Sequence, residues 1–285
     1  MKQFSHEKIF LSLLGIAFSL QANAQIETPA ASPLSKMEQK VGLTDVTVTY
    51  SRPGMKGRKI FGDLVPFGKL WRTGANENTK VTFSDDVIIA GKTLKKGTYA
   101  IFSKPNAGSW DIMFYNDASN WGTPRNWNDA NVALTTTVKT QTLPANVETF
   151  TISFGDLTSN SAVLGIMWEK TYVGIKFNTP TDKAVEESIA RTMNGPSAND
   201  YYASAVYYLT EDKDINKAKE WINKAVDMTK DQPRFWYLRQ QSLILAKAGD
   251  KKGAIAAAKA SLSGAEKRGN ADYVKMNKEF LAKMQ

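Results

Sequence analysis

The chain has 285 residues, is 42% hydrophobic and carries a formal charge of +9, so it is long enough for two domains with buried cores. It has no cysteine, which excludes disulfides, a thiol nucleophile and cysteine-bound metals. Its only histidine, His6, lies in a segment that we expect to be removed. The remaining chain would then lack the residue that Ser-His-Asp catalysis and His-ligated zinc, copper or haem require. Carboxylate, lysine or tyrosine chemistry and an all-oxygen calcium site stay open.

Residues 1–24 have the pattern of a secretory signal peptide. Lys2 and Lys8 precede the apolar run Ile9–Leu20, and Ala22-Asn23-Ala24 is a small-x-small cleavage signal. The apolar run would span roughly 18 Å as a helix, against a hydrocarbon core of ~30 Å. We therefore predict export to the periplasm or medium, cleavage near Ala24-Gln25 and no membrane span. Residues 25–35 are rich in Pro, Ala, Ser and Thr and predict a flexible linker.

Residues 36–180 predict an all-β domain. Apolar and polar residues alternate from Thr44 onward, and no helical pattern interrupts the turn signals. An antiparallel β-sandwich or jelly-roll-like domain is the expected fold. We expect strands at 44–50, 79–83, 87–90, 98–103, 110–115, 132–142, 149–154, 163–168 and 172–177. Two hairpins are expected, one between 79–83 and 87–90 and one across residues 169–171.

Residues 181–285 predict an α-helical domain with helices at 182–193, 199–211, 214–229, 233–248, 250–265 and 270–284. Positions 36 residues apart align, and all of them except Ile222 carry small side chains, which indicates a repeat. The pairs are Ala218/Ala254, Ile222/Ala258 and Ala225/Ser261. The pattern resembles the second helix of a tetratricopeptide repeat, with a helical bundle as the alternative. Aromatic residues at helical spacing are core residues in either case, and a few of them could line a concave peptide-binding face.

The stretch from Tyr50 to Glu77 is the main candidate site. It combines glycines, basic residues and aromatic residues without helix or strand periodicity. Arginines offer planar, bidentate donors to a carboxylate, sulfate or phosphate, and Phe61, Leu64, Val65, Phe67, Leu70 and Trp71 would anchor the loop. The candidate ligand-binding residues are Arg52, Lys56, Arg58, Arg72, Asn76 and Glu77. The alternative is a structural network in which Arg52 and Arg72 pair with Asp63 and Glu77.

Several motifs in this stretch resemble those of a bacterial exported family, the domain of unknown function 2911 (DUF2911). They are Ser51-Arg52-Pro53, Lys56-Gly57-Arg58, Ile60-Phe61-Gly62, Leu64–Gly68 and Trp71–Glu77, followed by Gly97-Thr98-Tyr99-Ala100. The resemblance covers about residues 30–178. It implies an exported bacterial protein and supplies no catalytic residue, because the family has no established activity.

A second candidate site is the Asn- and Trp-rich loop at 116–131. Trp121 and Trp127 with Asn128 suit stacking on a sugar ring and hydrogen bonding to its hydroxyls, whereas edge packing and turn formation are the alternative. The spacing of the oxygens in this loop does not match an EF-hand, so we expect no metal site.

From the sequence we expect an exported, non-catalytic binding or scaffold protein without a cofactor. Its ligand would be an anionic or carbohydrate molecule, and its helical domain would contact an envelope protein. Nucleic acid is not expected, because the positive charge is spread along the chain outside residues 52–72. The alternative is a cofactor-independent hydrolase or lyase that acts on an envelope glycan through carboxylates, either Asp63 and Glu77 or Asp111, Asp117 and Asp129.

Overall fold

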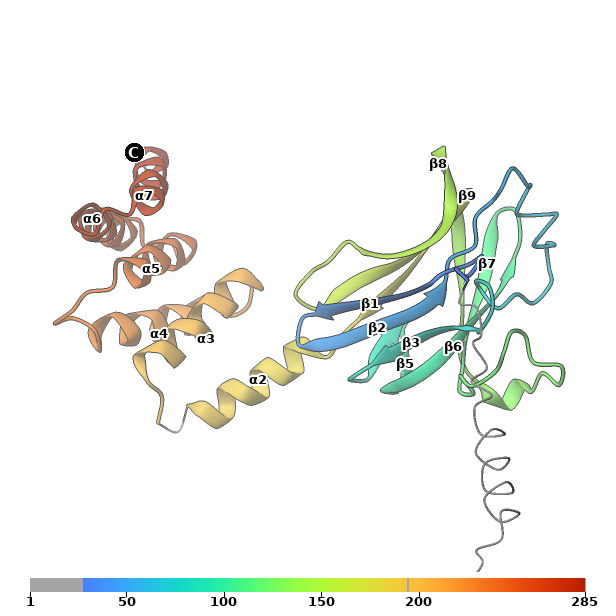
Figure 1. Cartoon of the computed structure of the whole chain (residues 1–285). Helices are drawn as coiled ribbons and strands as arrows, with labels where there is room; N and C mark the ends of the chain where they lie inside the picture. Colours follow the sequence, from blue (N-terminus) through green and yellow to red (C-terminus); the bar gives the residue numbers. More distant parts are fainter. Residues whose placement is uncertain (1–27, 194, 285) are drawn as a thin grey trace, which may run out of the picture. The chain divides into compact units, whose positions relative to one another are not determined.

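The computed structural model describes residues 28–193 and 195–284, and the chain divides into two compact units between Thr179 and Pro180 (Figure 1). The predicted signal peptide at 1–24 and residues 25–27 of the predicted linker lie outside the described residues. The first described strand begins at Leu34, so the end of that linker already belongs to the sheet.

The first unit is built on one open antiparallel sheet of nine strands, in the order β1-β2-β3-β6-β7-β8-β9-β4-β5. The antiparallel β prediction is thus confirmed. A 3-10 turn, η1, precedes β8 at Asp129–Asn131. The strands are β1 Leu34–Val41, β2 Thr44–Ser51, β3 Thr79–Phe83, β4 Val87–Ile89, β5 Lys92–Leu94, β6 Gly97–Pro105, β7 Ser109–Tyr115, β8 Val132–Gly155 and β9 Ser161–Asn178.

Two strands are longer than predicted. β8 runs through the expected break at 143–148, and β9 runs through the expected hairpin turn at 169–171. Between the pairs Thr142↔Thr171 and Val147↔Glu169, β8 advances five residues while β9 advances two. Pro144 falls within this shift of register, where the missing N–H of a proline costs no ladder hydrogen bond. The turn-forming residues therefore mark a bulge and not a strand end.

The predicted hairpin between 79–83 and 87–90 is also wrong. β3 pairs with β2 and β6, whereas β4 pairs with β5 and β9. The three residues between β3 and β4 thus carry the chain from one part of the sheet to another.

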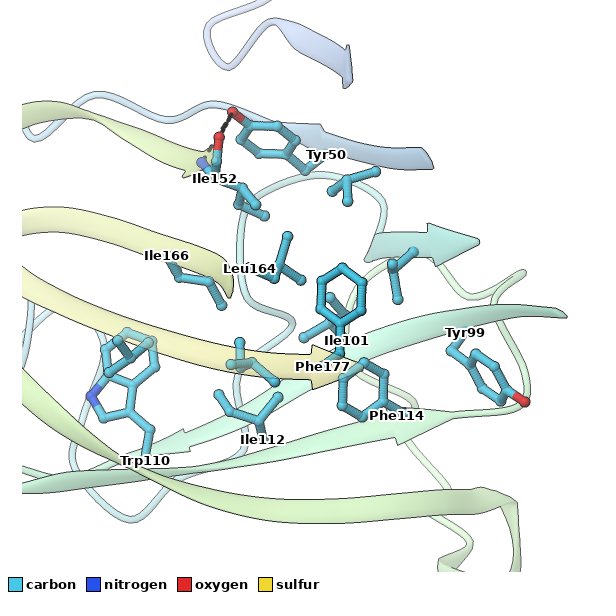
Figure 2. Packing of buried hydrophobic residues seen from close by; sticks show 14 of the residues in the cluster. Tyr50, Tyr99, Ile101, Trp110, Ile112, Phe114, Ile152, Leu164, Ile166 and Phe177 are labelled. Atoms are coloured by element: carbon cyan, nitrogen blue, oxygen red, sulfur yellow. Dashed lines mark hydrogen bonds between the residues drawn. The ribbon is translucent and has the colours of Figure 1, made fainter. Parts of the chain in front are cut away.

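The core of the first unit lies between parts of the sheet that are far apart in strand order. Figure 2 shows side chains of β6 and β7, such as Ile101 and Ile112, in one cluster with Leu164, Ile166 and Phe177 of β9. The Tyr50 hydroxyl on β2 donates to the Ile152 carbonyl and accepts from the Ile152 N–H on β8. β2 and β8 are not neighbours in the sheet, so the sheet must curve back on itself to bring them together.

The second unit is helical, and all six predicted helices are confirmed to within a few residues. They are α2 Thr181–Thr192, α3 Ala198–Thr210, α4 Ile215–Asp227, α5 Phe235–Lys247, α6 Lys251–Lys267 and α7 Ala271–Lys283. Side-chain caps begin four of them, at Ser197, Asp214, Asp250 and Asn270. No helix of the described residues is long and apolar enough to cross a membrane.

The repeat found in the sequence corresponds to equivalent buried positions on α4 and α6. Ala218, Ile222 and Ala225 on α4 and Ala254, Ala258 and Ser261 on α6 all have an exposure of 0%. Asp214 and Asp250, also 36 residues apart, cap the two helices by accepting hydrogen bonds from backbone N–H groups. Apart from Ile222, the repeat positions on α4 and α6 carry small side chains, which let neighbouring helices approach closely.

Candidate functional site

The candidate stretch forms an irregular loop between β2 and β3, which we call the clasp loop (residues 52–78). Backbone hydrogen bonds fasten it to two strands. Met55 N–H donates to the Glu148 carbonyl of β8 at 2.8 Å, and Trp71 exchanges two hydrogen bonds with Ser103 of β6 at 2.8 and 2.9 Å. These bonds fix where the side chains of the loop lie.

Aromatic packing holds the clasp loop on the core. The Trp71 ring lies parallel to Trp168 of β9, with 6.1 Å between the ring centroids, and edge-on to Phe150 at 5.5 Å. Phe61 packs against Trp110 at 4.8 Å. Phe61 and Val65 are buried as expected, whereas Leu64 and Phe67, which we expected to anchor the loop, are more than 40% exposed. Phe67 instead covers Gly62, where an added Cβ would lie 2.8 Å from its ring.

A cleft of about 380 Å³ opens where the clasp loop meets the sheet. Its volume is within the range of small-molecule sites. The partly exposed Trp71 and the almost fully buried Trp168 are among its lining residues, and Arg58 and Arg72 contribute guanidinium groups. Ser32 and Thr123 also line the cleft, and no lining residue among those described carries a carboxylate. The cleft therefore combines flat aromatic surface with positive charge.

Arg72 has the properties that a ligand-binding arginine requires. It is half-buried, and among the described residues no hydrogen bond or ion pair holds its guanidinium. Its Nη1 lies close to Gly122, where an added Cβ would be only 2.7 Å away. Gly122 has a φ of +79°, a conformation that favours glycine, and a side chain there would have to displace the nearby guanidinium.

Arg58 lines the same cleft but is partly used by the loop itself. Its Nε donates to the Met55 carbonyl at 2.9 Å, and its Nη2 donates to the Gly54 carbonyl at 2.7 Å. These bonds fix the direction of the guanidinium beside the cleft. A guanidinium carries five N–H donors, so donors remain for a ligand.

The other four candidates of the clasp loop do not line the cleft. Arg52 donates to the Phe150 carbonyl and to Thr151 Oγ1 on β8, and Asn76 donates to the Ser32 carbonyl, so both fasten the loop. Lys56 is exposed and is held through its backbone N–H by Glu148. Glu77 is exposed and pairs with Lys80 at 2.9 Å.

The expected pairing of Arg52 and Arg72 with Asp63 and Glu77 is wrong. Within the described residues neither arginine forms an ion pair, and Glu77 pairs with Lys80. Arg52 is structural as the alternative expected, although its partners are a carbonyl and a hydroxyl. The carboxylates that do reach the clasp loop, Glu148 and Glu169, accept from its backbone N–H groups.

Two of the three residues in the second candidate site have structural roles. The Trp127 ring stacks on Tyr115 with centroids 4.5 Å apart, and its Nε1 donates to Asp129 at 2.8 Å. The Asn128 side chain caps η1 by accepting from Ala130 N–H. Trp121 is 72% exposed.

The two candidate sites meet at the cleft. Gly122 lies against Arg72 and Thr123 lines the cleft, so this loop forms part of its border beside the exposed Trp121. Neither this juxtaposition nor the contribution of Trp168 was predicted from the sequence. The sequence has no local signal for either feature. Trp168 looks like an ordinary strand residue, and contacts between loops depend on tertiary structure. Within the described part of the chain, no three His, Cys, Asp or Glu side chains are grouped as a metal site would require.

Comparison with known families supports the resemblance seen in the sequence. The family model described as "Protein of unknown function (DUF2911)" matches residues 32–177, which is just over half of the chain. The chain belongs to the DUF2911 family. The matched region contains the clasp loop and the cleft, and it ends with β9, before the helical unit. No curated protein and no solved structure matches the chain significantly.

Proposed function

We propose that the chain is an exported, non-catalytic binding protein whose DUF2911 region holds a small anionic molecule that contains a ring. The observation that carries this proposal is the unpartnered Arg72 guanidinium in a cleft that also contains Trp71, Trp168 and Arg58. A guanidinium binds carboxylate, sulfate or phosphate groups through two parallel hydrogen bonds. The partly exposed Trp71 offers aromatic surface against which a sugar or another flat ring can pack. An acidic sugar combines both features.

Binding is favoured over catalysis because of where the carboxylates lie. General acid–base attack on a glycan needs two carboxyl groups facing one site, about 5–5.5 Å or about 6.5–9.5 Å apart. Asp63 and Glu77 are exposed, and none of the carboxylates suspected from the sequence lines the cleft. The hydrolase or lyase alternative therefore has no specific observation in its favour.

We propose that the helical unit serves as a protein-interaction surface with tetratricopeptide-like packing. In its favour, α3 contacts α5 and α5 contacts α7, in addition to the contacts of α3 with α4 and of α5 with α6. Tyr202 of α3 stacks on Tyr237 of α5 with centroids 4.2 Å apart. We likewise propose that the curved sheet is a sandwich-like arrangement, because one core is shared by strands at distant positions in the sheet.

Purified protein should gain thermal stability with acidic sugars, and Arg72→Ala should remove this gain. A ligand at a free concentration of about 100 times its Kd adds roughly 2.7 kcal/mol to the free energy of unfolding. Loss of a charged hydrogen bond of about 1.5–3 kcal/mol should weaken binding about tenfold to hundredfold. The measurement is a thermal-shift screen of acidic sugars and other envelope glycans, followed by titration calorimetry of any ligand found.

The matched control is Arg125→Ala, since Arg125 is exposed and lies in the neighbouring loop outside the cleft. Both variants should keep the melting temperature of the ligand-free protein, because neither arginine has a protein partner among the described residues. A ligand that binds Arg72→Ala as tightly as the unaltered protein would contradict this site. A large loss of stability in Arg72→Ala would assign the residue a structural role instead.

A further inference from the structure

The helical unit contains a second cavity, larger than the cleft of the β unit. It has a volume of about 790 Å³ and lies between the C-terminal half of α4, the connection to α5, the start of α5 and the C-terminal half of α6. We call it the α4–α6 groove. Figure 1 shows these three helices in succession along the chain.

The groove has an excess of positive charge that no ion pair among the described residues compensates, although Arg234 Nη1 donates to the Tyr237 hydroxyl at 2.7 Å. Four cations line it, Lys230, Arg234, Lys267 and Arg268, against the single carboxylate of Asp227. Within the described residues none of the five forms an ion pair, although other lysines of the same unit do, such as Lys224 with Glu220 at 2.7 Å. The lining therefore carries a net charge of +3 from four cations and one anion.

The groove also offers apolar and hydrogen-bonding surface. Trp236 is 37% exposed, and its ring packs edge-on against Phe235, with the ring centroids 5.0 Å apart. The Gln241 amide of α5 donates to Asn223 of α4 at 2.8 Å across the groove lining. An occupant could therefore bury an apolar side chain on Trp236 while its charged groups meet the lysines and arginines.

We propose that the α4–α6 groove binds an acidic peptide segment of a partner protein, with carboxylates flanking an apolar side chain. Charge complementarity selects this occupant. A single small anion of charge −1 or −2 would leave part of the +3 uncompensated, whereas a segment with three carboxylates balances it. The cations come from three elements, the α4–α5 connection, the start of α5 and the end of α6, which suits charges spread along a chain.

This inference deepens the proposed function, because it gives the helical unit a defined surface and a partner chemistry. It does not depend on the ligand of the β cleft. The test uses the full mature chain and a fluorescein-labelled peptide in which glutamate alternates with leucine, read by fluorescence anisotropy. The matched probes carry glutamine or lysine in place of glutamate.

We expect the glutamate peptide to bind, the glutamine peptide to bind at least about tenfold more weakly (~1.4 kcal/mol), and the lysine peptide not to bind. The double variant Lys230→Glu/Lys267→Glu should weaken binding of the glutamate peptide by about tenfold or more. Trp236→Ala should weaken it without a change in charge. Higher salt should also weaken it, because exposed charges are screened.

The control Lys252→Glu/Lys259→Glu makes the same change in net charge on α6, at exposed lysines outside the groove, and should bind like the unaltered protein. Arg72→Ala should also bind normally. Circular dichroism melting shows whether each variant is folded.

Equal binding by the groove and control variants, or no binding of the glutamate peptide, would overturn the inference. Loss of peptide binding in Arg72→Ala would move the peptide to the β cleft and overturn the groove assignment as well. Binding to vesicles of phosphatidylglycerol in phosphatidylcholine tests whether the groove binds an anionic membrane surface instead. Groove-dependent binding to these vesicles without peptide binding would replace the peptide by an anionic membrane surface. If the glutamate peptide does not bind but an acidic sugar still binds in a way that depends on Arg72, the groove inference fails while the proposed function of the cleft stands.

Discussion

Trp168→Ala is expected to lower the free energy of unfolding of the β unit by about 3–5 kcal/mol. Trp168 is 2% exposed and packs against Phe61, Trp71 and Phe150, with centroid distances of 6.4, 6.1 and 5.7 Å. Its Nε1 donates to the Glu148 carbonyl at 3.2 Å. Alanine would leave a cavity under the clasp loop and remove this hydrogen bond. The backbone amides of the sheet and of the loop should therefore exchange their hydrogens with solvent faster.

Hydrogen exchange followed by mass spectrometry measures this effect for the β unit separately from the helices, since amides of β6–β9 report its opening. The control is Trp121→Ala, because Trp121 is 72% exposed and its removal should change the free energy by no more than about 0.5 kcal/mol. Equal effects of the two substitutions would show that the aromatic cluster does not hold the clasp loop in place.

Ile222→Ala is expected to destabilise the helical unit by about 2–5 kcal/mol. Ile222 is fully buried on α4, in one cluster with Tyr208 of α3 and Ile244 of α5. It is the one large residue among the aligned small residues of the repeat, so its loss leaves a cavity shared by three helices. The amides of α3–α5 should exchange faster while those of β6–β9 keep their protection.

Met228→Ala provides the comparison, because it also shortens an apolar side chain at the end of α4 but at a position that is 54% exposed. It should change the free energy of unfolding by about 0.5 kcal/mol or less. If Ile222→Ala had an effect as small as Met228→Ala, the helices would not share the core described above.

The helices could be predicted from the sequence because their signals are local. Asp214 and Asp250 mark where α4 and α6 begin, and the apolar spacing within each helix identifies its buried face. The strands are less predictable because a strand ends where its pairing ends. Pro144 and the residues at 169–171 look like turns, yet β8 and β9 continue past them, because each strand pairs with the other on both sides of the bulge.

The residue types of the candidate site could be predicted, but not which of them would be free. Arg52, Arg58 and Arg72 look alike in the sequence. Arg52 is held by β8 and Arg58 partly by its own loop, whereas Arg72 keeps its donors. That difference depends on which carbonyl groups the fold brings near each guanidinium. The α4–α6 groove was outside the sequence prediction for the same reason, since its cations come from separate elements.

The tryptophan indole N–H signals in a ¹H–¹⁵N spectrum test the central claim most directly, because the chain has seven tryptophans at separate places. An acidic sugar found in the thermal-shift screen should move the Trp71 and Trp168 signals and leave Trp127 and Trp236 unchanged. Arg72→Ala should abolish these shifts at the same ligand concentration. Shifts confined to Trp127 or Trp236, or shifts of Trp71 that persist unchanged in Arg72→Ala, would contradict the cleft as the binding site.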